Sequence, residues 1–130
     1  MILGIGIDTI ATDRFESWST LPHSSLQRIF SDQEITYCLS AKNPTQHFAA
    51  RFAAREALLK ALSPLCAKKL SLLTIAKSSR ISKLPNGAPQ LLVEWEKLPE
   101  LLVPPTTLVI HLSLSHTKES ATALVIVEQL

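Results

Sequence analysis

The sequence predicts an α+β fold in which helices, mainly in the first half of the chain, pack on a small, mainly antiparallel sheet. Three observations lead to this prediction. Residues 46–62, QHFAARFAAREALLKAL, contain no Gly or Pro and are rich in strong helix formers. Residues 106–115 and 121–128 are rich in Val, Ile, Leu and Thr, which favour strands. The short link at 116–120 predicts that these two strands form an antiparallel hairpin.

The chain begins with a predicted strand at residues 2–8, ILGIGID, which carries two glycines on one face. Because a glycine has no side chain, that face leaves room for another element to approach closely. We expect Asp8 at the end of this strand, beside the gap. Position alone leaves two interpretations of Asp8 open: a cap or turn residue before the next helix, or a ligand in a site.

Capping signals and apolar patterns predict further short elements on both sides of the long helix. Ser31 and Glu34 form an S-x-x-E capping box that opens a helix to about Leu39. The strand at 121–128 has apolar residues on both faces, which predicts a central place in the sheet. The remaining predicted elements are short helices at 12–18 and 25–30, strands at 70–76 and 90–95, and a turn at 85–87.

Length and composition indicate one globular domain that spans residues 1–130. The net charge is +2, 46% of residues are hydrophobic and 18% are charged, which excludes a disordered chain and a strongly basic nucleic-acid binder. No apolar run approaches the roughly 18 residues of a membrane span, and MILGIGID lacks the charged start of a signal peptide. We therefore expect a cytoplasmic protein in which Cys38 and Cys66 are reduced thiols.

The long predicted helix carries charged side chains among apolar ones. Glu56 and Lys60 share one face with small apolar residues, because they recur at steps of three and four positions. One interpretation is a surface pair of Glu56 with Lys60, worth roughly 0.2–0.5 kcal/mol. The other is a metal or phosphate site, with Glu56 as a ligand and Arg51 and Lys60 as anion binders. The helix alone leaves both open.

Candidate chemistry is concentrated in Asp8, in Glu56 with Arg51 and Lys60, and in the polar hairpin at 113–117. Asp8 and Glu56 are hard oxygen ligands. Two carboxylates completed by phosphate oxygens and water are typical of a Mg²⁺ site. With basic residues to hold a phosphate-bearing substrate, this set is consistent with phosphoryl transfer.

Two histidines lie near the predicted hairpin. His111 lies within a strand and is expected to be satisfied in the sheet. His116 lies in the polar hairpin and is the better site candidate, able to bind phosphate or to assist proton transfer. Their spacing matches neither a zinc-binding helix motif nor an alternating His triad.

Four stretches, taken together, resemble one known family. They are GIGID at 4–8, RFAAREALLKAL at 51–62, NGAP at 86–89 and SLSHTKESATALVIVE at 113–128. In this order they resemble holo-[acyl-carrier-protein] synthase, the small bacterial type of 4′-phosphopantetheinyl transferase, over nearly the whole chain. The resemblance implies the fold of that family and an enzyme that supports fatty acid biosynthesis. It implies transfer of 4′-phosphopantetheine from coenzyme A to a serine of apo acyl carrier protein, with release of adenosine 3′,5′-bisphosphate.

The resemblance also implies a catalytic centre formed by Asp8, Glu56 and Lys60. Asp8 and Glu56 match the Mg²⁺ ligands, and Lys60 matches the residue that meets the coenzyme A phosphates near the metal. The implied mechanism is in-line attack by the carrier serine on the β-phosphate, with Lys60 stabilising charge on the bridging oxygen. Three candidates for the base stay open: Glu56, Glu34 and a metal-bound water.

Further positions are implied to bind the two substrates. Arg51, His116 and Thr117 match positions that hold the nucleotide part of coenzyme A. Arg14 and Arg28 match basic positions that meet the acidic carrier protein. The family is typically a homotrimer with sites between subunits, so the coenzyme A residues are expected to come from two chains.

The chain departs from the family pattern at three places. Ser63 and Pro64 replace a Gly-rich turn, Ala88 replaces a lysine of the NGKP turn, and Arg55 replaces the usual lysine before the metal-binding glutamate. These changes bear on coenzyme A affinity and carrier specificity. Two rival functions stay open: a Mg²⁺-dependent phosphohydrolase, and a non-catalytic trimeric module that binds coenzyme A or a nucleotide.

Overall fold

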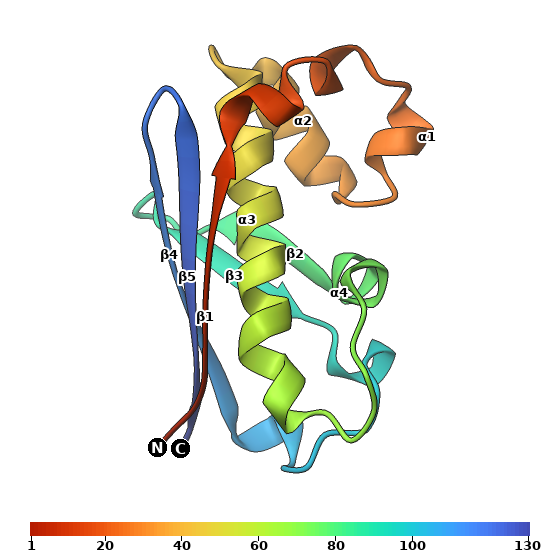
Figure 1. Ribbon diagram of the computed structural model, residues 1–130, viewed down its shortest axis with the longest axis vertical. Coiled ribbons are helices and arrows are strands. Elements are labelled where there is room, and N and C mark those ends of the chain that lie inside the picture. Colours follow the sequence, from red (N-terminus) through yellow and green to blue (C-terminus); the bar gives the residue numbers. More distant parts are fainter.

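The computed structural model describes residues 1–130 and has the predicted α+β architecture (Figure 1). The strands are β1 (Ile2–Ala11), β2 (Ser79–Lys83), β3 (Pro89–Val93), β4 (Leu108–His116) and β5 (Ser120–Gln129). The α-helices are α1 (His23–Leu26), α2 (Asp32–Ser40), α3 (Pro44–Leu62) and α4 (Leu72–Ser78). Short 3₁₀ helices cover Thr12–Phe15, Trp18–Thr20, Ser63–Leu65, Trp95–Lys97 and Pro105–Thr107.

The main sheet is antiparallel and has the strand order β1-β5-β4, so the predicted central place of β5 is confirmed. A separate antiparallel hairpin pairs β2 with β3. Figure 1 shows α3 along one face of the main sheet, with α2 and α4 on the side of α3 away from the sheet. The other face of the sheet is not covered by any element (Figure 1).

Two glycines of β1 allow α3 to lie directly on the sheet. A Cβ atom on Gly4 would lie 2.0 Å from the carbonyl oxygen of Ala61, and one on Gly6 would lie 1.8 Å from that of Ala57. Both distances are far inside van der Waals contact, and both obstacles are backbone atoms. The prediction that the glycine face admits another element is therefore confirmed, and that element is α3.

The uncovered face of the main sheet carries an apolar patch, called the outer patch here and formed by Ile5, Ile7, Leu124 and Ile126. Ile5 and Ile7 are 62% and 57% exposed. On β5, Ile126 and Leu124 lie directly opposite them. Because directly opposite residues of an antiparallel pair share a face, the four side chains are neighbours.

The segment predicted as a strand at 70–76 forms helix α4 instead, so this prediction was wrong. Ser71 caps the helix by accepting a hydrogen bond from the Thr74 backbone N–H. Ile75 and Ala76 are buried while Leu73 is 49% exposed, which is the pattern of a helix with one apolar face. The Leu-rich run suggested a strand, and the Ser cap was the overlooked helix signal.

The first strand continues past its predicted end. β1 runs to Ala11 and pairs with β5 along its length, which places Asp8 opposite Ala123 inside the strand. Asp8 is therefore not a helix cap, because the sheet hydrogen bonds continue beyond it. The helix predicted at 12–18 is split into two 3₁₀ helices.

The predicted capping box is present at the start of α2. The Ser31 hydroxyl accepts from the Glu34 N–H, and the Glu34 carboxylate accepts from the Ser31 N–H. α3 begins at Pro44, slightly earlier than predicted, with the proline in its first turn. No helix of the chain combines the length and apolar character needed to cross a membrane.

Both cysteines are free thiols, and neither forms a disulfide. Burial raises the pKa of the Cys38 thiol to about 11. This thiol therefore stays protonated at neutral pH and behaves as a small core residue.

Candidate active site

Asp8 and Lys60 meet at the β1 edge of the main sheet. Lys60 Nζ donates to Asp8 Oδ1 at 3.1 Å and to the Ile7 carbonyl at 2.9 Å. The second carboxylate oxygen, Asp8 Oδ2, is buried and has no hydrogen-bond partner. An unsatisfied buried acceptor costs free energy, so this oxygen is suited to a cation or to a donor from a ligand.

Glu56 lies on α3 one turn before Lys60 and is partly exposed. The surface pair of Glu56 with Lys60 does not form, because Lys60 pairs with Asp8 instead. This leaves the Glu56 carboxylate without an ion-pair partner, on the same face of α3 as Lys60.

No third His, Cys, Asp or Glu joins Asp8 and Glu56, so the protein alone does not form a complete metal cage. Mg²⁺ usually keeps several waters and substrate phosphates among its ligands and takes only one or two carboxylates from the protein. The orphaned Asp8 Oδ2 and the free Glu56 carboxylate therefore suit Mg²⁺ in the presence of a phosphate-bearing substrate.

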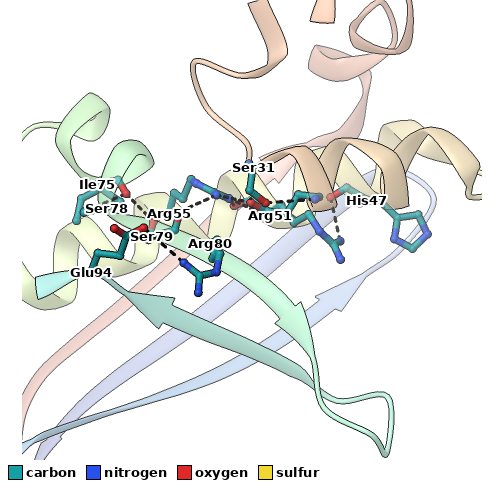
Figure 2. Close-up of polar contacts among 10 residues, drawn as sticks. Ser31, His47, Arg51, Arg55, Ile75, Ser78, Ser79, Arg80 and Glu94 are labelled. Atoms are coloured by element: carbon teal, nitrogen blue, oxygen red, sulfur yellow. Dashed lines mark hydrogen bonds and ion pairs between the residues drawn. The ribbon is translucent and has the colours of Figure 1, made fainter. Parts of the chain in front are cut away.

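Glu34 and Arg55 form a buried ion pair that joins α2, α3 and β2. The Arg55 guanidinium donates to the two Glu34 oxygens at 2.8 and 2.7 Å and to the Ser79 carbonyl at 3.1 Å. Both side chains are 0% exposed. Figure 2 shows Arg55 at the centre of this network, reaching toward Ser79. Both oxygens of Glu34, one of the three candidate bases, are therefore engaged in a buried structural ion pair.

The pKa of Glu34 reflects two opposing effects. Burial raises the pKa, but the hydrogen bonds and charge of Arg55, with the Ser31 hydrogen bonds, outweigh burial and lower it overall. The carboxylate is thus held ionised inside the protein.

Arg51 is also buried but has no carboxylate partner. It is 4% exposed. Its Nη1 reaches only the His47 carbonyl, at 3.5 Å, and its Nε has no partner. Figure 2 shows Arg51 beside His47, one turn along α3 from Arg55. A desolvated guanidinium without an anion is costly, so Arg51 is suited to bind an anionic group.

The hairpin between β4 and β5 approaches α3 at His47, one turn before Arg51. The ring centroids of His116 and His47 are 6.2 Å apart. The Thr117 hydroxyl accepts from the backbone N–H groups of Glu119 and Ser120, at 3.2 and 3.1 Å, and so shapes the hairpin tip.

His47 lies between basic groups: the Arg51 guanidinium donates to its carbonyl at 3.5 Å, and the His116 ring centroid is 6.2 Å from its own. Burial lowers the pKa of His47, and the nearby charges of Arg51, His116 and Lys83 lower it further. The structure thus places Arg51 and His116, two of the residues expected to hold a nucleotide, on either side of His47, and Thr117 directly follows His116.

Arg14 and Arg28 are exposed near the start of the chain and have no acidic partner within it. The Arg14 guanidinium lies 5.9 Å from the Phe15 ring centre and 5.8 Å from that of Phe52. These rings hold Arg14 at the surface through cation–π contact, while its charge remains available to a partner.

The two groups of candidate residues lie at opposite edges of the main sheet. Asp8 is on β1 and His116 ends β4, with β5 between them. On α3, Arg51 precedes Glu56 by five residues, which places their side chains about 140° apart around the helix. We call the first group the metal half and the second group the nucleotide half. The body of α3 separates the two halves within one chain.

A protein-family model described as the 4′-phosphopantetheinyl transferase superfamily matches residues 4–121, which include both halves of the site. The chain belongs to this superfamily. The holo-[acyl-carrier-protein] synthase of Syntrophus aciditrophicus is 37% identical over 134 residues, covering 100% of this chain and 98% of the relative. The holo-[acyl-carrier-protein] synthase of Chlamydia trachomatis is 38% identical over 130 residues, covering 98% and 100%.

Solved structures of the same kind of enzyme have the fold of this transferase. The holo-(acyl-carrier-protein) synthase of Bacillus anthracis, in complex with CoA (3′,5′-ADP), has a TM-score of 0.73 at 32% identity and covers 100% of this chain and 99% of its own. The Helicobacter pylori enzyme, in complex with coenzyme A, has a TM-score of 0.71 at 31% identity and covers 95% and 99%. The resemblance read from the sequence motifs and the expected fold are both confirmed.

Several contacts around the candidate site were not predicted from the sequence. The Glu34–Arg55 pair joins residues 21 positions apart, and the capping box predicted the place of Glu34 but not its partner. Tyr37 lies on α2 and Lys83 on β2, and only in the folded chain do Lys83 and Arg51 both pack on the Tyr37 ring. The spacing of His47 and Arg51, four residues apart on one helix face, was the one local signal for this group.

Proposed function

We propose that this transferase moves 4′-phosphopantetheine from coenzyme A to a serine of apo acyl carrier protein, releasing adenosine 3′,5′-bisphosphate and supporting fatty acid biosynthesis. Relatives that match along nearly their full length are named holo-[acyl-carrier-protein] synthases, and two structural neighbours contain coenzyme A or its 3′,5′-ADP part. The observation that carries the proposal is the buried, unpartnered Asp8 Oδ2 beside Lys60. We propose that residues 1–130 act as one domain, in the cytoplasm.

In this proposal Asp8 and Glu56 hold Mg²⁺. The bound metal would neutralise charge on the diphosphate of coenzyme A. The orphaned oxygen of Asp8 and the free carboxylate of Glu56 support this assignment, because both gain a partner when the cation and substrate bind.

The reaction is a direct displacement at the β-phosphorus of coenzyme A. A bond forms from the carrier serine oxygen to this phosphorus, and the bond from phosphorus to the bridging oxygen breaks. The serine gives up its proton, and the bridging oxygen leaves with adenosine 3′,5′-bisphosphate. Lys60 is placed to meet the charge that develops on this oxygen, since its side chain is 53% exposed and anchored at Asp8. Of the two glutamates considered as base, Glu34 is buried in its ion pair, and Glu56 remains.

A complete site in this proposal takes its two halves from neighbouring copies in a homotrimer. The diphosphate is joined directly to the nucleotide, so Asp8 and Arg51 must approach the same coenzyme A molecule. Within one chain these residues lie at opposite edges of the sheet, on different sides of α3. Two adjacent strand spacings of about 4.8 Å put the outer strands roughly 10 Å apart, before side chains are counted. A second copy would bring its nucleotide half to the metal half of the first.

The outer patch supports this assembly. Its four apolar side chains lie on the uncovered face of the main sheet, and Ile5 and Ile7 are more than half exposed. The hydroxyl groups of Thr9 and Thr122 meet at 2.9 Å beside them and supply polar surface. An exposed apolar patch with polar surroundings is typical of a protein contact surface.

Arg14 and Arg28 are proposed to meet the acyl carrier protein. Carrier proteins implied by the resemblance are acidic, and exposed basic side chains favour encounter with an acidic partner. Arg14 is held in place by Phe15 and Phe52, so its charge is presented with little loss of side-chain freedom.

The test is intact-mass spectrometry of an apo acyl carrier protein incubated with the transferase, coenzyme A and Mg²⁺. The proposal predicts a gain of one phosphopantetheine on the carrier, lost when a chelator is added or when Asp8 is replaced by Asn. Release of the phosphate from coenzyme A without modification of the carrier would indicate a phosphohydrolase. Coenzyme A binding with neither reaction would indicate a non-catalytic module.

A further inference from the structure

A polar hollow of about 410 Å³ lies where the segment between α1 and α2 meets the end of α4 and the start of β2. Its lining includes Gln27, Lys77, Arg80, Glu94 and Lys97. We call it the α4 pocket. Figure 2 shows Arg80 and Glu94 at one end of the polar network around Arg55, with His47 at the other end. The α4 pocket is therefore separate from the nucleotide half of the site.

Positive charge predominates in the α4 pocket. Its lining holds three cations against one carboxylate, which leaves a net charge of +2. The carboxylate, Glu94, is shared: it accepts from the Arg80 guanidinium at 3.4 Å and lies 2.8 Å from Lys97 Nζ. Lys77, in the last turn of α4, is exposed and takes part in no ion pair of the chain. Its charge is therefore not compensated within the protein.

The acidic side chains next to the pocket are directed elsewhere. Asp32 is held by His23 and Gln27, at 3.0 and 2.9 Å. Glu96, the neighbour of Lys97, lines a different hollow beside the proline-rich connection. The positive charge of the α4 pocket is thus available to an anionic group from another molecule.

The α4 pocket adjoins the segment proposed to meet the carrier protein. Gln27 lines the pocket and directly precedes Arg28 in the chain. Figure 1 shows α1 and α4 on the same side of α3, away from the main sheet. A specific protein contact buries roughly 800 Å² on each partner, which is far more than the two side chains of Arg14 and Arg28 supply. A partner seated on Arg28 with that footprint would also cover the α4 pocket.

We propose that the α4 pocket is a second docking point for the acyl carrier protein, where Lys77, Arg80 and Lys97 receive a carboxylate side chain of the carrier. This inference rests on the proposed function, whose carrier is acidic. A guanidinium has five N–H donors and an ammonium has three, so Arg80 and Lys97 keep donors free while they hold Glu94. The three are positioning residues. They act on encounter with the carrier and on its affinity, because they touch neither coenzyme A nor the metal half.

The test is the charge reversal Lys77→Glu, which breaks no contact of the folded chain. Transfer is followed by mass gain of an apo acyl carrier protein over a range of carrier concentrations. The KM for the carrier is expected to rise roughly fivefold, as the loss of one exposed charge pair predicts. The kcat and the KM for coenzyme A should not change. The rise should shrink between about 0.05 and 0.5 M salt, because salt screens exposed charges.

Lys68→Glu provides the matched control, because Lys68 is an exposed lysine in the loop before α4 and the change in net charge is the same. An equal rise in the carrier KM for both variants, or a rise that does not depend on salt, would overturn the inference. A pocket that binds inorganic phosphate while Lys77→Glu leaves the carrier KM unchanged would overturn it in favour of a small-anion site.

Calorimetric titration of the transferase with apo carrier, without coenzyme A, separates this inference from the proposed reaction. Weaker carrier binding by Lys77→Glu, from a transferase that modifies no carrier, would reject the reaction and keep the docking point. Normal transfer with equal carrier binding by Lys77→Glu, Lys68→Glu and the unmodified chain would do the reverse.

Discussion

Replacing Glu34 by Gln is expected to destabilise the protein by about 3–5 kcal/mol, because it leaves the Arg55 guanidinium buried without its counter-ion. Both side chains are 0% exposed, and the pair is held by hydrogen bonds of 2.8 and 2.7 Å. The pair joins α2 to α3, and Arg55 also binds the Ser79 carbonyl of β2. The loss should therefore loosen three elements together.

The magnitude can be expressed as a melting temperature. Unfolding entropy is about 2.1 cal/mol/K per residue, or roughly 0.27 kcal/mol/K for this chain of 130 residues. A loss of about 3–5 kcal/mol then lowers Tm by roughly 11–18 °C. Thermal unfolding followed by circular dichroism measures this shift, and urea unfolding measures the free energy directly.

The double variant Glu34→Leu with Arg55→Met separates charge from packing. It removes both charges and keeps apolar bulk, so it should be more stable than Glu34→Gln or Arg55→Met alone. Arg80→Met is the matched control, since its ion pair with Glu94 is partly exposed and contributes about 0–1 kcal/mol. The reasoning is refuted if Glu34→Gln and Arg55→Met melt like Arg80→Met, or if the double variant loses the sum of the losses of Glu34→Leu and Arg55→Met.

Three further predictions concern the sheet and its surroundings. Gly6→Ala should lower the free energy of unfolding by more than the roughly 1–3 kcal/mol of ordinary overpacking, because the new Cβ would lie 1.8 Å from the Ala57 carbonyl oxygen. A melting temperature within about 2 °C of that of the unmodified protein would contradict the close approach of α3. Stability in urea should fall as the pH drops below about 4, because the folded pKa of Glu34 lies below its unfolded value near 4.3. The stability that the ionised carboxylate contributes above that value is lost as the pH falls through the folded pKa. A pH profile identical to that of Glu34→Gln would exclude this origin. Ile7→Asp should yield folded monomers in light scattering, since it places a charge in the outer patch; an unchanged trimer would show that this patch is not the contact surface.

Local signals were sufficient for much of the fold. The capping box at Ser31, the apolar character of both faces of β5 and the glycines of β1 are each visible within one short segment, and each correctly predicted a feature of the fold. The metal half was accessible for the same reason. Glu56 and Lys60 share a helix face, and Asp8 belongs to the strand on which that helix lies.

The rest depended on contacts between distant segments. The run at 70–76 is rich in Leu and suits either a strand or a helix, and its packing against α3 decided for the helix α4. The partner of Glu34 is Arg55, and nothing in the local pattern distinguishes Arg55 from Arg51, four residues earlier. Only the folded chain shows that Arg51 is unpaired and that Arg55 is neutralised by Glu34. The separation of the two site halves is likewise visible only in the folded chain, because it depends on the order of the strands in the sheet.

The most direct test of the shared site is a mixing experiment with two inactive variants. Asp8→Asn removes a proposed metal ligand and keeps the proposed nucleotide-binding residues, while Arg51→Met removes a proposed nucleotide-binding residue and keeps the proposed metal ligands. If each site joins the metal half of one copy to the nucleotide half of the next, a trimer assembled at random from equal amounts of both variants contains intact sites at about one quarter of its interfaces. Refolding the mixture should therefore restore about a quarter of the unmodified transfer rate, measured by mass gain of the carrier. A mixture no more active than either variant alone would show that each chain builds its own site, and would contradict the account.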